Sequence, residues 1–256
     1  MLNVSYNVID TRSTHYMACK LYTISNTKTI KSQSAGYMTF ILHLAPADEA
    51  GVGNMCAKST AGCRAGCLNK AGHGGMFTPG AITNPVQTAR VRRTKLFASD
   101  RQAFLTLLVM DTIEACRIAT KKQLIPIFRL NGTSDIPWEK ITVDGYSIFD
   151  FFPDIQFYDY TKILGRKVTH IPNYHLTFSQ ADGNEADVDA AIKQGYNIAT
   201  VFYKSLPLEY KGLTVVNGDE SDMRFLDPTG VIVGLTAKGP AKKDYTGFVI
   251  RLTNVV

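Results

Sequence analysis

Three of the five cysteines in this chain stand close together in the sequence, as Cys56, Cys63 and Cys67. Their C-x6-C-x3-C spacing falls in a loop from 54 to 75 that is rich in glycine, alanine and serine and has neither helical nor strand periodicity. Three cysteines cannot all pair with one another, and no secretory signal is evident. The pattern therefore favours a metal or cluster site over a disulfide framework. Three thiolates leave one coordination position open, as in a [4Fe-4S] cluster that binds a ligand at its unique iron.

Two other interpretations of this cysteine loop stay open. His73 follows Cys67 closely and would complete a Cys3His site for structural zinc. The three thiols could instead be small, reduced residues in a tight loop that binds no metal. The other two cysteines are not expected to take part, because Cys19 lies in an N-terminal extension and Cys116 shares the apolar face of a helix.

A second group of chemically capable side chains follows the apolar runs farther along the chain. Nearly every run is followed at once by polar residues, which include Asn131, Ser134, Asp135, Asp159, Thr161, Lys162, Ser179, Gln180, Lys204, Asn217, Asp219, Asp222 and Lys238. In a parallel barrel all these strand ends open on one face, where such folds keep their active sites. Asp, Asn and Ser also end strands and begin turns, so each residue has a structural interpretation as well.

The types of these side chains indicate roles. We predict catalytic roles for Asp135, Lys162 and Asp219, because carboxylates accept protons or hold Mg²⁺ and a lysine binds carboxylate or phosphate. Cofactor binding is predicted for the other candidates, which are Asn131, Ser134, Ser179, Lys204, Asp222 and Lys238.

A basic run follows the cysteine loop and is expected to lie on a helix. It contains Arg90, Arg92, Arg93 and Lys95. Clustered arginines on one helix make it the best candidate for contact with phosphate, on a cofactor or on nucleic acid. Such a run is also compatible with an ordinary solvated face.

The elements that must position these residues alternate along the chain. Seven short runs of β-branched or aromatic residues are expected to be strands, at 37–44, 124–130, 155–158, 174–178, 197–203, 213–216 and 230–235. Helices are expected from Pro85, after an N-cap at Ser99, and over 185–194 before Gly195. Parallel strands need crossovers, which are normally helical. The alternation therefore predicts an α/β fold with a complete or partial parallel (β/α) barrel, while an open doubly wound sheet stays possible.

Composition sets the broad class. With 256 residues, 45% hydrophobic and 20% charged, the chain has the makeup of an ordinary globular protein. We expect an N-terminal extension over 1–36 and one barrel-like domain over 37–256. No tract is long and apolar enough for a membrane span, and a cytoplasmic location is expected. The net charge of +6 favours an anionic partner such as a nucleotide or nucleic acid.

Several of these motifs together resemble the phage-encoded gene product 88 family. The resemblance rests on the cysteine loop, on the region of Arg90 and Arg93, and on the strand ends at 128–135 and 157–162, and it covers roughly residues 25 to 240. It implies a phage source, and hence a host-cell cytoplasm, more than a reaction. A looser similarity is to radical S-adenosylmethionine enzymes, which place three cysteines on a loop after the first barrel strand. That similarity implies a radical-SAM-like barrel and a cluster open to the cofactor's amino and carboxylate groups. The spacing here departs from their usual C-x3-C-x2-C, and Gly66 stands where they carry an aromatic residue.

Functions of different classes follow from these observations. The first is an iron-sulfur protein whose [4Fe-4S] cluster binds S-adenosylmethionine and acts on a nucleotide or nucleic acid. The alternative is a zinc-stabilised nucleic-acid-binding or replication-associated protein without radical chemistry. A metal-dependent nuclease using Asp135, Asp219 and Asp222 is a third option, although their spacing fits no defined motif.

Overall fold

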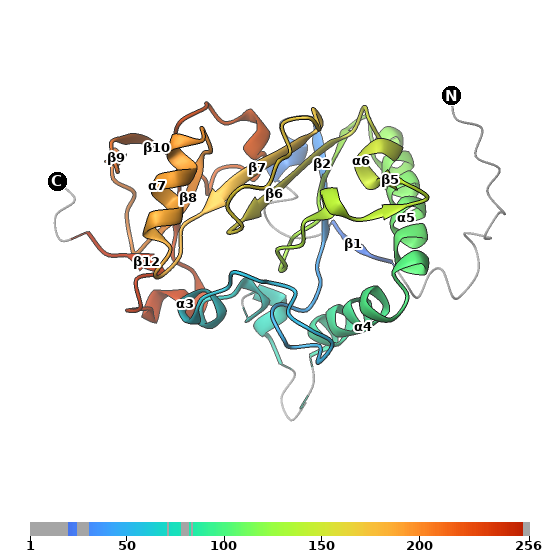
Figure 1. Ribbon diagram of the computed structural model, residues 1–256, viewed down its shortest axis with the longest axis horizontal. Helices are drawn as coiled ribbons and strands as arrows, with labels where there is room; N and C mark the ends of the chain where they lie inside the picture. Colours follow the sequence, from blue (N-terminus) through green and yellow to red (C-terminus); the bar gives the residue numbers. More distant parts are fainter. Residues whose placement is uncertain (1–19, 25–30, 71, 78–81, 83, 253–256) are drawn as a thin grey trace.

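The protein is built around one large, mostly parallel β-sheet, seen in a computed structural model that describes residues 20–24, 31–70, 72–77, 82 and 84–252 (Figure 1). All seven predicted strands are confirmed within a few residues. They are β2 (Tyr37–Leu42), β3 (Ile125–Arg129), β6 (Gln156–Thr161), β7 (Tyr174–Ser179), β8 (Ile198–Phe202), β10 (Leu213–Asn217) and β11 (Ile232–Thr236).

These strands are parallel to one another in the order β2-β3-β6-β7-β8-β11-β10. β1 (Tyr22–Thr23) pairs antiparallel with β2, and β9 (Glu209–Tyr210) pairs antiparallel with β10. β12 (Val249–Ile250) runs parallel beside the end of β8, and β4 (Thr142–Val143) and β5 (Tyr146–Ser147) form a separate hairpin. Within the described residues the two ends of the sheet do not pair, so the sheet is open and the expectation of a complete barrel is wrong.

The helices are α3 (Ala61–Ala65), α4 (Pro85–Ser99), α5 (Arg101–Lys121), α6 (Ile148–Phe151) and α7 (Glu185–Lys193). Single 3-10 turns add η1 (Leu68–Lys70), η2 (Gly72–Gly75), η3 (Trp138–Lys140), η4 (Arg224–Leu226) and η5 (Gly239–Lys243). α4 begins at Pro85, as predicted. α5 is capped by Asp100, whose carboxylate accepts from the Ala103 amide at 2.9 Å, and not by Ser99. No helix in the described part of the chain is long and apolar enough to cross a membrane.

The two faces of the sheet are covered by different segments, because side chains alternate along each strand. Phe128 and Phe157 belong to the core that contains α5 residues such as Leu108. Their neighbours Ile127 and Tyr158 point the other way and pack with Met223, just before η4. The loop around η4 therefore fills the face that would line the interior of a barrel.

The described part of the predicted N-terminal extension joins this architecture. Leu21 is buried in the main core, β1 forms an edge of the sheet, and the Ser32 hydroxyl bonds that of Thr39 at 2.9 Å. Residues 1–19, which include Cys19, and 25–30 lie outside the described residues.

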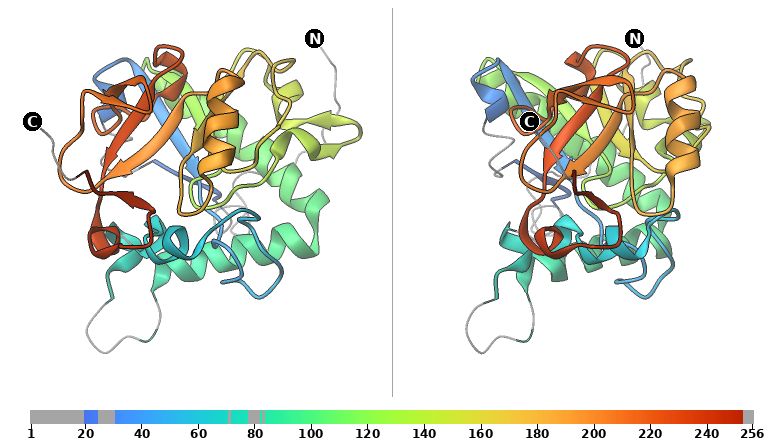
Figure 2. Two further views of the ribbon diagram at one scale, coloured as in Figure 1. Left: turned by 60° about the vertical axis from the view of Figure 1, so that its left-hand side comes forward. Right: turned by 90° about the vertical axis from the view of Figure 1, so that its left-hand side faces the viewer.

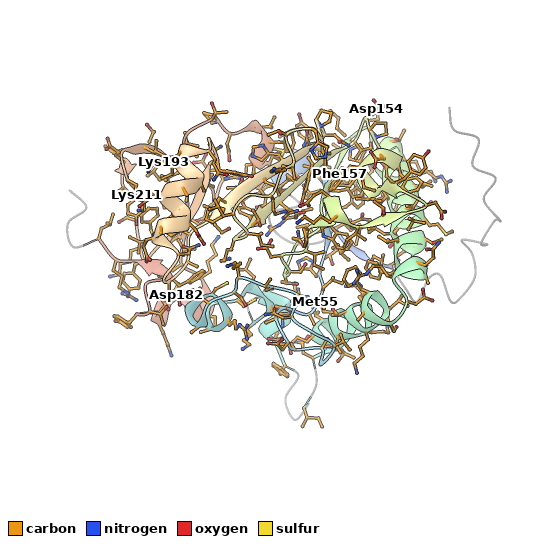
Figure 3. All side chains as sticks on the ribbon, in the orientation of Figure 1. Met55, Asp154, Phe157, Asp182, Lys193 and Lys211 are labelled. Atoms are coloured by element: carbon orange, nitrogen blue, oxygen red, sulfur yellow. The ribbon has the colours of Figure 1, made fainter. Side chains whose placement is uncertain are left out.

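The carboxyl ends of the parallel strands lie on one side of the molecule, together with the cysteine loop. Figure 1 shows α3 and α4 across that end of the sheet. In Figure 3, Met55 of the cysteine loop and Asp182 after β7 lie there, whereas Asp154, which precedes β6, and Lys193, which precedes β8, lie at the opposite end. The fold thus brings the cysteine loop to the strand ends, as the alternation of elements predicted.

Candidate functional site

The first part of the cysteine loop is fixed to the segment that follows β3. The Thr133 hydroxyl donates to the Leu44 carbonyl at 2.5 Å, and the Asp135 amide donates to the Met55 carbonyl at 2.8 Å. Just before them, Gly132 lies so close to β2 that a Cβ there would come within 2.7 Å of the Leu42 carbonyl oxygen. The adjacent Cys56 thiol donates to the Thr133 carbonyl at 3.6 Å. Cys56 is therefore held directly against the end of β3.

The second cysteine sits on α3, which is attached to the end of β7. Thr60 caps this helix, because its hydroxyl accepts from the Cys63 amide at 3.2 Å. The Asp182 carboxylate accepts from the Thr60 hydroxyl and from the Gly62 amide, the latter at 3.1 Å. One carboxylate from the turn after β7 thus fixes the start of the helix that carries Cys63.

The third cysteine is held by polar residues on the other side of the loop. The Asn69 amide donates to the Cys67 sulfur at 3.5 Å, and the Asn69 side chain donates to Glu49 at 2.6 Å. The buried guanidinium of Arg90 donates to the same Asn69 side chain. Arg90 therefore belongs to the framework of the cysteine loop.

The three thiols share an environment with the ammonium group of Lys162. Burial raises the pKa of Cys56 to about 11 and also raises the pKa of Cys67, while the Lys162 charge opposes both shifts. Burial alone would lower the pKa of Lys162, but Cys63 and Asp135 outweigh it and raise that pKa. The half-buried thiols thus lie around one cation at the carboxyl end of the sheet.

The arrangement of the thiols bears on which metal they could bind. Among the residues that the structure describes, no three or more His, Cys, Asp or Glu side chains are arranged as ligands of a single ion. His73 lies on η2 and is exposed to solvent, whereas the three cysteines are half-buried. The structure therefore does not support His73 as a fourth ligand of a Cys3His zinc site.

Asp135 and Lys162 lie together beside the cysteine loop. The Asp135 carboxylate accepts from the Lys162 amide at 2.8 Å and pairs with Arg166 at 3.6 Å. Asp219 has other partners at the ends of β10 and β11, where it pairs with Lys238 at 2.6 Å and accepts from the Thr236 amide. The structure brings the first two predicted catalytic residues together and pairs the third with a predicted cofactor-binding lysine.

A model of the gene product 88 family matches residues 19–252. The chain belongs to the gene product 88 family. No curated protein and no solved structure gives a significant match. The similarity to radical S-adenosylmethionine enzymes gains no support from these comparisons, and it stays a prediction for this member of the gene product 88 family.

In this family member, several other predicted site residues form hydrogen bonds with groups of the protein itself. The Asn131 side-chain oxygen accepts from Ser134 at 2.9 Å and from the Trp138 indole at 3.1 Å, so Asn131 and Ser134 shape the turn after β3. Asp222 is buried and accepts from Arg129 and Tyr158 at 3.1 and 3.2 Å. These contacts give all three residues a structural role, and their part in cofactor binding stays a prediction.

The remaining candidates differ in exposure. Ser179 is half-buried at the end of β7. Lys204 is exposed, with its ammonium 5.4 Å from the centre of the Tyr203 ring.

The basic run on α4 does not form one surface. Arg90 is buried, Arg93 donates to the Lys20 carbonyl, and Arg92 and Lys95 are exposed.

Sequence reasoning missed Asp182, Glu49 and Asn69, which hold the cysteine loop in place. Asp182 carried a usable signal, because it follows β7 in the same way that Asp135 follows β3. Glu49 and Asn69 lie inside the loop itself, and their pairing depends on how the loop folds back. No periodic pattern could have shown that.

Proposed function

We propose that this protein is an iron-sulfur protein in which Cys56, Cys63 and Cys67 hold a [4Fe-4S] cluster. The observation that carries the proposal is the grouping of three thiols from one loop around Lys162. The loop is fixed to the ends of β3 and β7, so little conformational freedom is left to lose when a ligand binds.

The donor set and its charge suit such a cluster. Cysteine thiolates are the usual ligands of iron-sulfur clusters, and three of them with the cluster carry net negative charge. A buried anion is tolerated only when a cation or hydrogen bonds compensate it. Lys162 and Arg90 supply positive charge on two sides of the loop, since both interact electrostatically with cysteines of the group.

A cluster and a zinc ion would need different separations of the thiols. A single zinc ion draws three thiolates to a common centre with Zn–S distances of about 2.3 Å. In a cluster each thiolate binds a different iron atom, so the sulfurs stand farther apart. The described thiols do not stand as ligands of a single ion, and metal analysis decides between the two arrangements.

Three cysteines leave one iron without a protein ligand, and we propose that it accepts S-adenosylmethionine. Once reduced by an external one-electron donor, such a cluster would supply the electron that breaks a carbon–sulfur bond of this cofactor, releasing methionine and a 5′-deoxyadenosyl radical that would act on a nucleotide or nucleic-acid substrate. Lys162 and Asp135 lie beside the cysteines with the charges to attract a carboxylate and an amino group. The net charge of +6 supports an anionic substrate.

Metal analysis of protein purified without oxygen and supplied with iron and sulfide tests the proposal. We expect roughly four irons and four sulfides per chain, with the visible absorption of thiolate-to-iron charge transfer. Cys56→Ala, Cys63→Ala and Cys67→Ala should lose the iron, and Cys116→Ala, on α5, should keep it. Colourless protein that carries one zinc would instead establish the zinc-stabilised alternative.

A further inference from the structure

We infer that the surface formed by Tyr203, Lys204, Lys243, Tyr245 and Arg251 binds single-stranded nucleic acid. We call this the Tyr-Arg surface. It joins the end of β8 to the segment that contains η5 and β12, and it lies next to the cysteine-bearing helix α3. The inference rests on the proposed function for the class of substrate, but it concerns a different part of the molecule.

The centre of the Tyr-Arg surface is a guanidinium group between two aromatic rings. The Arg251 guanidinium carbon lies 3.7 Å from the centre of the Tyr203 ring and 4.1 Å from that of Tyr245. Arg251 also donates to the Asp244 and Lys242 carbonyls at 3.0 and 2.9 Å. These contacts fix both rings and the cation in one geometry before any ligand arrives.

The outer ring of this stack is open to solvent. Tyr245 is 82% exposed although it is one of the largest side chains of the segment. One of its faces contacts Arg251, and the exposed remainder is free to stack on a flat ligand. Nucleic-acid bases stack on such rings regardless of sequence, because every base has a π face.

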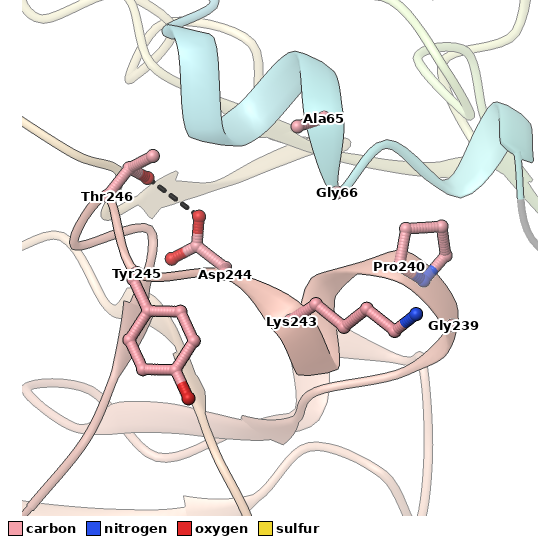
Figure 4. Close-up of a pocket in the computed structure, with 8 residues that line it drawn as sticks. All are labelled: Ala65, Gly66, Gly239, Pro240, Lys243, Asp244, Tyr245 and Thr246. Atoms are coloured by element: carbon pink, nitrogen blue, oxygen red, sulfur yellow. Dashed lines mark hydrogen bonds between the residues drawn. The ribbon is translucent and has the colours of Figure 1, made fainter.

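Two hollows flank the stack. The larger, about 590 Å³, lies between the end of α3 at Ala65 and Gly66 and the segment that carries Lys243 and Tyr245 (Figure 4). The smaller, about 230 Å³, is lined by Lys204 and Arg251, among other residues. The larger hollow has the size of a small-ligand site.

The charges along this path suit phosphate groups. Lys204 and Lys243 are exposed, and Lys242 adds a third exposed cation. The one carboxylate at the larger hollow, Asp244, is buried and accepts from the Thr246 hydroxyl at 2.7 Å and the Val249 amide at 3.0 Å. Its charge is therefore compensated from within the protein, and cations face the solvent. Alternating cations and aromatic faces are the features by which proteins hold single strands.

The position of the larger hollow connects the two sites. Gly66 forms part of its wall and directly precedes Cys67, and η5 contacts α3. Figure 2 shows the C-terminal segment against α3 in both views. A single-stranded nucleic acid bound on the Tyr-Arg surface would extend toward the cysteine loop.

Binding of a labelled single-stranded DNA of mixed sequence, about 15 nucleotides long, tests the inference by fluorescence anisotropy with the full chain. Tyr245→Ala should weaken binding about tenfold through lost stacking. Lys243→Gln should weaken it and reduce the salt slope by about one. Tyr146→Ala on β5 and Lys193→Gln on α7 are the matched controls and should bind as the wild type does. Unchanged circular dichroism and melting temperature establish that each variant is folded.

Wild-type affinity in both Tyr245→Ala and Lys243→Gln would overturn the inference, as would equal losses in the control variants. Equal affinity for a duplex of the same sequence would also overturn it, because duplex bases cannot stack on a protein ring. The Cys67→Ala variant separates the two proposals. Binding that persists without iron supports the Tyr-Arg surface on its own, and bound iron without DNA binding rejects the surface but leaves the cluster intact.

Discussion

Lys162 is the residue on which the charge balance of the cysteine loop depends. It lies in the strand-end position that the sequence predicted, but its surroundings in the structure are thiols and Asp135. A cation beside the ligands of a metal centre stabilises the deprotonated ligands and the charge of the whole centre. In the proposed centre, Lys162 would therefore hold the thiolates and the cluster in their charged state.

Replacing Lys162 should weaken cluster retention. We expect Lys162→Met to lose iron to a chelator about 10 to 100 times more readily than the wild type, as is usual for groups that surround metal ligands. Lys162→Arg keeps the charge and should recover part of the loss. The exposed Lys140→Met serves as the control. Equal iron release from Lys162→Met and Lys140→Met would show that Lys162 does not support the cluster.

A second ionisable residue, Asp159, affects the pH dependence of the folding stability and lies outside the candidate site. Asp159 is fully buried and accepts from the Asn131 amide at 2.7 Å and the Tyr174 hydroxyl at 3.0 Å. Burial raises its pKa to about 7. Because this pKa is above the value in the unfolded chain, the folded protein binds more protons at intermediate pH. The contribution to stability is full below the unfolded pKa and falls as the pH rises toward 7.

This buried carboxyl group predicts a specific pH dependence. The free energy of unfolding from urea titrations should decrease between pH 5 and pH 7 by an amount on the order of 1 to 3 kcal/mol attributable to Asp159. Asp159→Asn should flatten the profile in this range, and the exposed Asp154→Asn should not. A wild-type slope in Asp159→Asn would assign the pH dependence to other groups.

Residue types and strand ends were enough to find the cysteine group, Asp135 and Lys162. Residue types and strand ends could not distinguish a side chain that faces the site from one that is already hydrogen-bonded within the protein. Asn131 and Asp222 follow strands just as Asp135 does, yet Asn131 bonds Ser134 within its own turn and Asp222 pairs with Arg129 from a distant part of the chain. Only the folded chain shows which polar groups are already paired.

At the scale of elements, α3 is held between the end of β7 and the C-terminal segment. A Cβ at Gly62 would overlap the Thr246 hydroxyl and would come within 2.7 Å of Asp182 Oδ1 and 2.8 Å of the Phe248 Cβ. Glycine is needed here because two segments approach the same point of the helix. The seven strands were predictable from their apolar runs, whereas this contact depends on a segment some 180 residues away, beyond the reach of local patterns.

Enlarging this glycine should therefore disturb α3. We expect Gly62→Ala to lower the free energy of unfolding by about 1 to 3 kcal/mol, because a methyl group is forced into a filled space. Ala61→Ser adds one atom on the exposed side of the same helix and should change the stability little. Urea denaturation of the two variants compares them. Equal stability of Gly62→Ala and Ala61→Ser would mean that the C-terminal segment moves aside freely.

At the scale of the whole molecule, the sheet is open because its edges and its inner face are already occupied. β1 and β9 pair with the outer parallel strands, and the loop around η4 packs against the face that a barrel would enclose. The alternation of strands and helices predicted correctly that the strands are parallel, although β11 lies between β8 and β10 instead of after them. It could not predict closure, which depends on the edge pairings and on which segment fills the interior.

The filling of this face depends on a buried ion pair. Arg129 and Asp222 lie 3.1 Å apart, and both are largely buried. Asp222→Asn would leave the guanidinium without its counter-ion and should lower the free energy of unfolding by about 3 to 5 kcal/mol. Asp219→Asn breaks the more exposed pair with Lys238 and should lower it by about 1 kcal/mol or less. Thermal unfolding would contradict this account if the two variants melted together.

The contact at Gly62 also determines when α3 can take its final position during translation. The cysteines leave the ribosome well before the residues that lock α3 in place, Thr246 and Phe248. At about 5 to 20 residues per second, translation from Cys67 to Ile250 takes roughly 10 to 40 s. Throughout that interval Cys63 stands on a helix without its final support, and the thiols are open to any oxidant or metal ion nearby. The complete cysteine loop thus forms only after Thr246 and Phe248 have been made, although its own sequence is made much earlier.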